Sequence, residues 1–183
     1  MLILKSFRKA FGDQLILDVP ELTFAPGIHW VKGKNGSGKS TLFNCLAGLS
    51  PFNGEVVLHD ISLSKSPRPY KKRVNYSQSE PSFPEFLSGD DLINYFAQLK
   101  DADLVQVERL TNGLGVSAYS SQPCGTYSSG MMKKLSITIA FLGKPEWIIL
   151  DEPLITLDKE AQDLVAQLIA EDTKQALLSF LQP

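Results

Sequence analysis

The stretch G-K-N-G-S-G-K-S-T, residues 33–41, decides the fold of this 183-residue chain. It fits the pattern G-x-x-x-x-G-K-[ST], in which glycines let backbone N–H groups close around phosphate oxygens. An apolar run before it, residues 27–33, predicts a strand, and residues 39–49 predict a helix that stops at Gly48. A strand, a glycine-rich loop and a helix in this order form the opening unit of the P-loop folds.

The candidate phosphate-binding residues share this loop and the first turn of the helix. The helix N-terminus adds a positive dipole, Lys39 places a mobile charge on the β- and γ-phosphates, and the Ser40 hydroxyl is a candidate Mg²⁺ ligand. A glycine-rich turn without a ligand is the alternative, but such a match arises by chance in fewer than about one in a hundred chains of this length. The set is Gly33, Asn35, Gly36, Ser37, Gly38, Lys39, Ser40 and Thr41.

A second motif, W-I-I-L-D-E-P at residues 147–153, predicts a fully buried strand that ends in two carboxylates. Ligands bind at the carboxyl ends of parallel strands, so Asp151 and Glu152 are expected beside the phosphates. Asp151 is predicted to hold Mg²⁺, and Glu152 is predicted to polarise an attacking water as a general base. Two solvated carboxylates at a strand end are the alternative, which the phosphate loop in the same chain makes the weaker interpretation.

Short apolar runs that alternate with helical patterns predict a mostly parallel sheet with helices on its faces. Two runs near the start, separated by a Gly12-Asp13 turn, and a later hairpin arm predict antiparallel pairing as well. The predicted strands are residues 1–7, 14–19, 27–33, 54–63, 74–78, 146–153 and 176–180.

Further helical patterns lie in the second half of the chain. Residues 128–143 and 159–172 predict helices, and the second is amphipathic. Residues 81–130 are richer in Ser, Pro, Asp and Gly, with helical patches at 91–100 and 103–110, and predict an inserted helical subdomain. The apolar face of the last helix consists of Leu164, Val165, Leu168 and Ile169.

Composition limits the class of protein. A length of 183 residues with 43% hydrophobic residues is typical of one folded domain. The net charge of −2 argues against a nucleic-acid partner held by bulk electrostatics. With two cysteines, Cys45 and Cys124, reduced thiols are expected rather than a disulfide. No apolar run approaches the ~18 residues of a membrane span, so another chain is expected to cross any membrane involved.

The two motifs, with the pieces around them, resemble the ATP-binding subunit of ABC transporters, in the same order over nearly the whole chain. Y-S-S-G-M, residues 127–131, stands where the family signature L-S-G-G-Q belongs, and I-T-L-D, residues 155–158, matches the D-loop. Gln78 matches the Q-loop glutamine, and Phe11 takes the place of the aromatic residue that stacks on adenine. The extended match Y-S-S-G-M-M-K-K-L resembles the signatures of ABC-2-type exporters.

The resemblance implies a fold and a domain division. The expected fold is α/β: a P-loop NTPase (RecA-like) core with a mostly parallel sheet, an N-terminal antiparallel β subdomain and an inserted helical subdomain. Residues 1–183 would form one nucleotide-binding domain. Residues 1–80 and 131–183 would be its ATP-binding core, and residues 81–130 its helical subdomain.

The resemblance also implies roles at a shared site. In a head-to-tail dimer, the Ser128 hydroxyl and the Gly130 N–H would contact the γ-phosphate bound by the opposite subunit, beside Ser129 and the D-loop residue Asp158. Gln78 would act in catalysis and bind Mg²⁺. The signature departs from the family pattern where Ser129 replaces a glycine and Met131 replaces the glutamine.

Plainer interpretations of these residues remain open. Ser128 can be an ordinary helix N-cap, Phe11 a core or rim aromatic, and Gln78 an exposed polar residue. Lys71-Lys72-Arg73 is interpreted as a solvated face rather than a lipid-facing patch.

The family's histidine at the end of the last core strand has no counterpart. The slot is Leu181, and both histidines, His29 and His59, lie far upstream and are not placed to be ligands. With the chain ending at Pro183, the family's further C-terminal strands and helices are expected to be missing. Losing one donor aimed at the transition state costs ~10²–10³ in rate, so the chain is expected to bind Mg-ATP well and hydrolyse it slowly.

The expected activity is therefore that of an ABC-type ATPase with ATP and Mg²⁺ as cofactors, at the inner face of the cell membrane. The expected partners are an integral-membrane permease, docked near residues 85–96, and a second nucleotide-binding domain, as a homodimer or a heterodimer, without nucleic acid. One alternative is a hydrolysis-impaired, nucleotide-gated dimerisation module that pairs with a more competent homologue. A soluble ABC protein acting on translation or DNA and a small-molecule P-loop kinase are weaker alternatives, because the first usually carries two cassettes or coiled coils and the second needs no signature.

Overall fold

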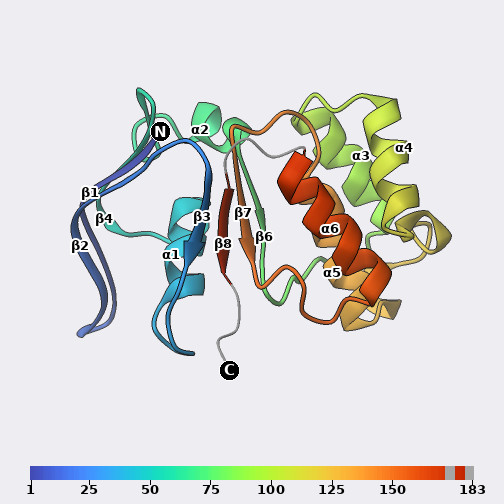
Figure 1. Cartoon of the computed structure of the whole chain (residues 1–183), viewed down its shortest axis with the longest axis horizontal. Coiled ribbons are helices and arrows are strands. Elements are labelled where there is room, and N and C mark those ends of the chain that lie inside the picture. The colour runs from blue at the N-terminus through green and yellow to red at the C-terminus, as the bar shows by residue number, and fades with distance from the viewer. Residues whose placement is uncertain (172–175, 180–183) are drawn as a thin grey trace.

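The computed structural model describes residues 1–171 and 176–179, and it holds two four-stranded sheets on either side of one helix (Figure 1). The antiparallel sheet has the order β2-β1-β4-β5 and the parallel sheet has the order β3-β8-β7-β6. The antiparallel strands are β1 (Leu2–Phe11), β2 (Gln14–Phe24), β4 (Asn53–Leu58) and β5 (Ile61–Ser62). The parallel strands are β3 (Ile28–Val31), β6 (Val74–Ser77), β7 (Trp147–Asp151) and β8 (Ala176–Ser179).

Helix α1 (Lys39–Leu46) fills the space between the two sheets. Its buried Phe43 and Leu46 share one hydrophobic cluster with Leu4 of the antiparallel sheet and with Trp147 and Ile149 of the parallel sheet. The helix ends before Gly48, whose φ of +70° is a left-handed conformation that glycine adopts without strain. The loop that precedes α1 is therefore anchored by a helix fixed on both sides.

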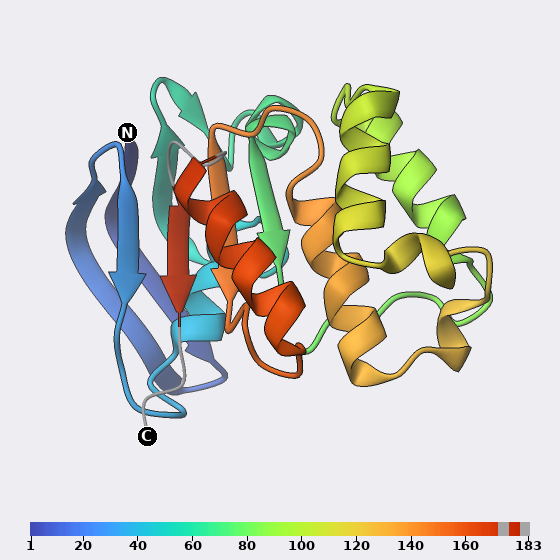
Figure 2. The same cartoon turned by 45° about the vertical axis from the view of Figure 1, so that its right-hand side comes forward.

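The other face of the parallel sheet carries the remaining long helices (Figures 1 and 2). Side chains alternate along β7, so Ile148 and Leu150 pack with Leu135 and Val165 in a second cluster. Asp151, two residues after Ile149, therefore lies on the face that looks toward α1. The helices are α3 (Gly89–Leu99), α4 (Leu104–Gly113), α5 (Ser129–Ala140) and α6 (Lys159–Glu171), with 3₁₀ turns at Val116–Ala118 and Cys124–Thr126.

The predicted fold class is confirmed: a parallel sheet, an N-terminal antiparallel sheet and a set of helices are all present. The predicted helices at 39–49, 91–100, 103–110, 128–143 and 159–172 correspond to α1, α3, α4, α5 and α6. The first two strands are longer than predicted. Val165, Leu168 and Ile169 of α6 are buried as expected, and Leu164 is half-buried. The division at residues 80 and 131 stays a prediction.

One helix, α2 (Pro67–Arg73), was not predicted. Two prolines in its sequence indicate a loop, yet proline is tolerated in the first turn of a helix because the N–H it lacks has no partner there. The fully buried Tyr70 fixes α2, since its hydroxyl donates to Leu46 O of α1 over 2.9 Å. Lys71 and Lys72 are exposed and Arg73 is half-buried, largely as the solvated-face interpretation expects.

Both cysteines are buried and unpaired, as predicted. Within residues 1–171 and 176–179, no helix has the length and apolar character needed to cross a bilayer. Leu181, at the position of the family's histidine, lies outside the described residues. So do residue 172, the last of the predicted helix 159–172, and residue 180, the last of the predicted strand 176–180.

Candidate functional site

The phosphate loop joins β3 to α1 at the carboxyl end of the parallel sheet (Figure 1). Gly36 and Gly38 have φ values of +77° and +92°, and Gly38 is the N-cap of α1. A Cβ on Gly38 would lie 3.1 Å from side-chain carbons of Ile16 and Leu17 on β2. Glycine is therefore required there both by backbone conformation and by the close approach of the antiparallel sheet.

Lys39 is folded back onto its own loop. Its Nζ donates to Gly33 O over 2.7 Å and to Lys34 O over 3.3 Å, and the residue is 8% exposed. Ser40 and Ser37 are exposed and Thr41 is half-buried. The loop with the adjoining turn of α1 therefore presents a buried lysine, hydroxyl groups and the free N–H groups of a helix start, which are donors suited to phosphate oxygens.

Asp151 ends β7 beside Ser179 of β8, because the two strands pair in parallel with Asp151 opposite Ser179. The Ser179 hydroxyl donates to Asp151 Oδ1, and both residues are buried. Asp151 Oδ2 is buried and has no hydrogen-bond partner. A buried carboxylate oxygen without a partner is costly unless a cation or donor reaches it, so this atom fits the predicted Mg²⁺ ligand.

Glu152, the predicted general base, is half-buried and adopts a φ of +50°. Its N–H approaches Ser179 O and Ser179 Oγ, each at 3.2 Å. A positive φ in a non-glycine residue is strained, and such strain clusters at functional sites. This strained turn places Glu152 directly after the magnesium candidate Asp151.

Gln78 follows the last residue of β6 and meets α1 through its side chain. Its Nε2 donates to Asn44 Oδ1 over 3.4 Å, and the residue is half-buried rather than exposed. The Gln78 amide is thus near the phosphate-loop helix, although this long contact leaves it free to reorient. Asn44 has no role in the sequence interpretation.

The signature residues stand at the start of α5, where Ser128 is the N-cap. Its Oγ accepts from Met131 N over 3.2 Å, so the N-cap interpretation is correct in this structure. Ser128 and Ser129 are exposed and Gly130 is half-buried. Tyr127 connects the start of α5 to the segments before it. Its hydroxyl donates toward Tyr119 O and Gln122 O and accepts from Gly89 N of α3.

The D-loop lies against this helix start. A Cβ on Gly130 would come within 2.9 Å of Thr156 O, so a side chain at 130 would displace the loop. Asp158 caps α6 by accepting from Ala161 N over 2.9 Å and pairs with Lys134 Nζ at 2.5 Å. The Lys134 hydrogen bond lowers the pKa of Asp158.

Lys133 was also missed by the sequence interpretation. Only 1% of it is exposed, and its Nζ donates to Gln78 O, Ser79 O and Asp151 O. Burial lowers its pKa to about 8, against the opposing effect of the Asp151 and Glu152 charges. A lysine among the apolar residues of a predicted helix was the only signal in the sequence.

Phe11 ends β1 and is 56% exposed. The Lys9 Nζ lies 4.4 Å from the ring centroid in a cation–π contact, and the residue stays largely exposed. A planar base can stack on an exposed aromatic ring.

The structure therefore brings the phosphate loop, Asp151, Glu152 and Gln78 together at one end of the parallel sheet. It joins Gly130 and Asp158 at a second place, around the start of α5. Among the described residues, no hydrogen bond or ion pair links Ser128, Ser129 or Gly130 to the phosphate loop. In the part of the chain that the structure describes, no three His, Cys, Asp or Glu residues cluster as a metal site.

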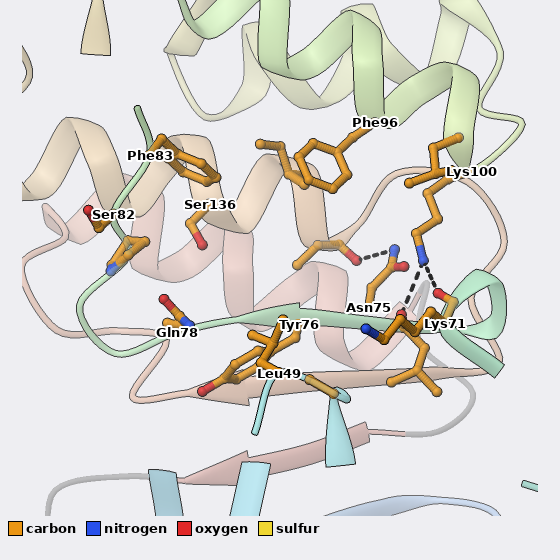
Figure 3. Close-up of a pocket in the computed structure, with 16 residues that line it drawn as sticks. Leu49, Lys71, Asn75, Tyr76, Gln78, Ser82, Phe83, Phe96, Lys100 and Ser136 are labelled. Atoms are coloured by element: carbon orange, nitrogen blue, oxygen red, sulfur yellow. Dashed lines mark hydrogen bonds between the residues drawn. The ribbon is translucent and has the colours of Figure 1, made fainter. Parts of the chain in front are cut away.

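A groove of about 440 Å³ runs from Gln78 between β6 and α3 (Figure 3). Its apolar lining includes Leu49 after α1, Tyr76 on β6, and Phe96 and Leu99 on α3. Leu49 and Leu99 are 59% and 49% exposed. Of the residues 85–96 expected to dock a partner, only Phe96 lines this groove.

A phosphate loop, a Q-loop glutamine, a signature helix and an acidic strand end in this order define a nucleotide-binding domain, and the chain belongs to the ABC transporter family. The family model described as "ABC transporter" matches residues 17–155, which contain all four features.

Two curated relatives and one solved structure illustrate this membership. The aliphatic sulfonates import ATP-binding protein SsuB 2 of Burkholderia cenocepacia (strain HI2424) is 34% identical over 160 residues, or 86% of the chain. The rat ATP-binding cassette sub-family A member 7 is 29% identical over 175 residues, or 88% of the chain. A solved structure titled "Structure of ATP binding subunit of ABC transporter" superposes with a TM-score of 0.87 and 25% identity, covering 98% of the chain and 79% of its own.

The chain is shorter than both relatives. It spans 58% of the SsuB protein and 8% of the rat protein. One relative is named as an import ATP-binding protein and the other as a member of sub-family A.

Proposed function

We propose that this chain is the ATP-binding subunit of an ABC transporter, which couples Mg-ATP binding, head-to-tail dimerisation and slow hydrolysis to a separate membrane permease. One observation carries the proposal: the glycine loop of α1, the unpartnered Asp151 Oδ2 and the Gln78 side chain converge at the same end of the parallel sheet. Residues 1–80 and 131–183 would form the ATP-binding core, and residues 81–130 the helical subdomain that contains α3 and α4.

The chain's own groups account for binding of the triphosphate. Gly36 and Gly38 turn backbone N–H groups toward phosphate oxygens, and the remaining loop residues Gly33, Asn35, Ser37 and Thr41 surround them. Lys39 exchanges its contacts with Gly33 O and Lys34 O for the β- and γ-phosphates. Phe11 stacks on the base.

Ser40, Gln78 and Asp151 would hold Mg²⁺, which neutralises charge on the phosphates. Ser179 keeps the Asp151 carboxylate oriented through Oδ1, so that Oδ2 is the atom available to the ion. Glu152 accepts the proton of the attacking water, and Gln78 orients that water.

The dimer is supported by the exposure of the signature residues. Ser128 and Ser129 are exposed at the start of α5, where unpaired N–H groups favour an anion, and no hydrogen bond within the described residues joins them to the phosphate loop. The γ-phosphate of a second subunit, of the same or a related chain, would meet the Ser128 hydroxyl, the N–H of Gly130 and the adjoining residues Ser129 and Asp158.

Slow hydrolysis follows from Leu181 in the slot of the family histidine, because a leucine donates no hydrogen bond to the γ-phosphate. The same residue favours a second candidate function: a nucleotide-gated dimerisation module, impaired in hydrolysis, that pairs with a more competent homologue. The intact Glu152 favours the first function.

The permease is supported by the apolar groove beside Gln78 (Figure 3). An amphipathic helix with apolar side chains three or four residues apart fits a groove lined by Leu49, Tyr76, Phe96 and Leu99. Such a contact would hold the chain at the inner face of the membrane.

The test combines dimerisation with turnover. Glu152→Gln is expected to form an ATP-dependent dimer in sedimentation velocity, and Ser128→Ala in the same background is expected to weaken it. Leu181→His is expected to raise single-turnover hydrolysis well above wild type. A monomer at saturating Mg-ATP refutes the sandwich. A fast wild-type rate that the histidine does not change refutes the slow-hydrolysis proposal.

A further inference from the structure

Lys133 is a buried cation in an unusual setting. An ammonium group has three N–H donors, and all three are used by backbone carbonyls: Gln78 O at 2.6 Å, Asp151 O at 2.8 Å and Ser79 O at 3.3 Å. Among the described residues, no carboxylate forms a hydrogen bond or an ion pair with it. All of its hydrogen bonds go to peptide carbonyls, while the nearby charges of Asp151 and Glu152 also favour the ammonium form.

The three acceptors belong to two segments of the proposed site. Gln78 O and Ser79 O are in the loop after β6, and Asp151 O is the last carbonyl of β7. Lys133 itself lies one turn into α5, the helix that begins after Ser128. One side chain therefore fastens the Q-loop, the acidic strand end and the signature helix to one another.

We propose that Lys133 is a positioning residue, whose ammonium holds Gln78 and Asp151 at the separation that Mg²⁺ and the attacking water require. This inference rests on the proposed function. It adds that Gln78 and Asp151, the two proposed Mg²⁺ ligands at the ends of the adjacent strands β6 and β7, are placed by the Lys133 ammonium, which touches neither the nucleotide nor the metal ion. Charge-assisted hydrogen bonds are about twice as strong as neutral ones, so the group is suited to fixing a loop that secondary structure does not hold.

Lys100, the C-cap residue of α3, is a structural lysine that serves as a comparison. Lys100 Nζ donates to Lys71 O at 2.5 Å and Val74 O at 3.1 Å, at the start of β6, whereas Lys133 acts just after its end (Figure 3 shows Lys100). Burial lowers the pKa of both lysines to about 8. The two side chains make the same kind of contact at opposite ends of β6, and only one of them is at the proposed site.

The test measures how much Mg²⁺ tightens ATP binding. ATP affinity is determined by fluorescence titration with excess Mg²⁺ and with EDTA, for wild type, Lys133→Met, Lys133→Arg and Lys100→Met. Methionine keeps the length of lysine without donors, and arginine keeps a cation with enough donors for all three carbonyls. Lys133→Gln replaces Lys133→Met if the methionine variant does not fold.

The expected result is specific to the metal. Changing a residue that orients a metal ligand costs about 10–100-fold in metal affinity, so Lys133→Met should lose most of the Mg²⁺-dependent gain and keep the affinity measured in EDTA. Lys133→Arg should recover part of the gain. Lys100→Met should keep all of it, with a lower melting temperature.

The inference is overturned if Lys133→Met keeps the full Mg²⁺-dependent gain. It is also overturned if Lys100→Met loses the gain equally, because the effect is then general destabilisation. A wild-type chain that binds ATP equally with and without Mg²⁺ refutes the magnesium site, and with it the positioning role. A wild-type chain that binds no ATP refutes the proposed function itself.

Discussion

Replacing Ser179 by alanine tests how the acidic strand end is held. The Ser179 hydroxyl donates to Asp151 Oδ1 in a fully buried setting, and Glu152 N–H also approaches it at 3.2 Å. Ser179→Ala leaves both oxygens of a buried carboxylate without partners, because Oδ2 has none already. A hydrogen bond to a charged group contributes ~1.5–3 kcal/mol, which corresponds to a ten- to hundredfold shift in the folding equilibrium.

Ser77→Ala is the matched control. Ser77 is also a fully buried strand serine of the parallel sheet, and it shares a 2.9 Å hydrogen bond with Ser136 Oγ. Both changes delete one hydroxyl oxygen, but the Ser77 bond joins two neutral groups and is expected to contribute ~0.5–1.5 kcal/mol. The difference between the two losses in free energy of unfolding therefore measures how much more a hydrogen bond contributes when its acceptor is the charged Asp151.

The assay is urea unfolding followed by circular dichroism without nucleotide, with the slope compared across wild type and both variants. Ser179→Ala should lose about 1 kcal/mol more than Ser77→Ala with an unchanged slope. Equal losses would show that Asp151 does not depend on Ser179. A more stable Ser179→Ala variant would refute the reasoning outright.

Three further outcomes are expected. Gly38→Ala should unfold at lower temperature and bind ATP far more weakly, because a left-handed backbone costs an alanine ~1–2 kcal/mol and its Cβ meets β2; ATP titration and thermal melts measure both. The pKa of Asp158 is lowered by Lys134, so the stability that Asp158 gives over Asp158→Asn should be complete above about pH 4 and vanish as the pH falls through the lowered pKa, in melts between pH 2 and 7. The Lys100 pKa is lowered to about 8, so between that pH and about 10.4 the unfolded state holds more protons; wild type should gain stability over Lys100→Met across this range in urea titrations.

The parts of the site that the sequence predicted are local patterns. The phosphate loop is one continuous stretch, and Asp151 and Glu152 directly follow the apolar run that buries them. The phosphate loop and the acidic pair each follow a predicted strand. They are therefore expected at the same end of a sheet, because parallel strands place their carboxyl ends together.

The parts that the sequence did not predict depend on segments far apart in the chain. Ser179 acts on Asp151 only because β8 pairs beside β7 in one register, and Lys133 acts on Gln78 only because α5 crosses the end of β6. Asn44 meets Gln78 across 34 positions. The α2 helix was not predicted for a local reason. Pro67 and Pro69 are typical of a turn, and only the packing of Tyr70 against α1 shows why the segment is helical.

The strand order β3-β8-β7-β6 has a consequence for biosynthesis. β8 sits between β3 and β7, although it lies about 150 residues beyond β3 in the chain. During translation, β3 must wait with an open edge for a neighbour that is synthesised about 150 residues later, and β7 must wait for the same strand. Unpaired edges invite pairing with other chains, so a stalled or truncated nascent chain should be an aggregation hazard and a chaperone client, while the finished one is not.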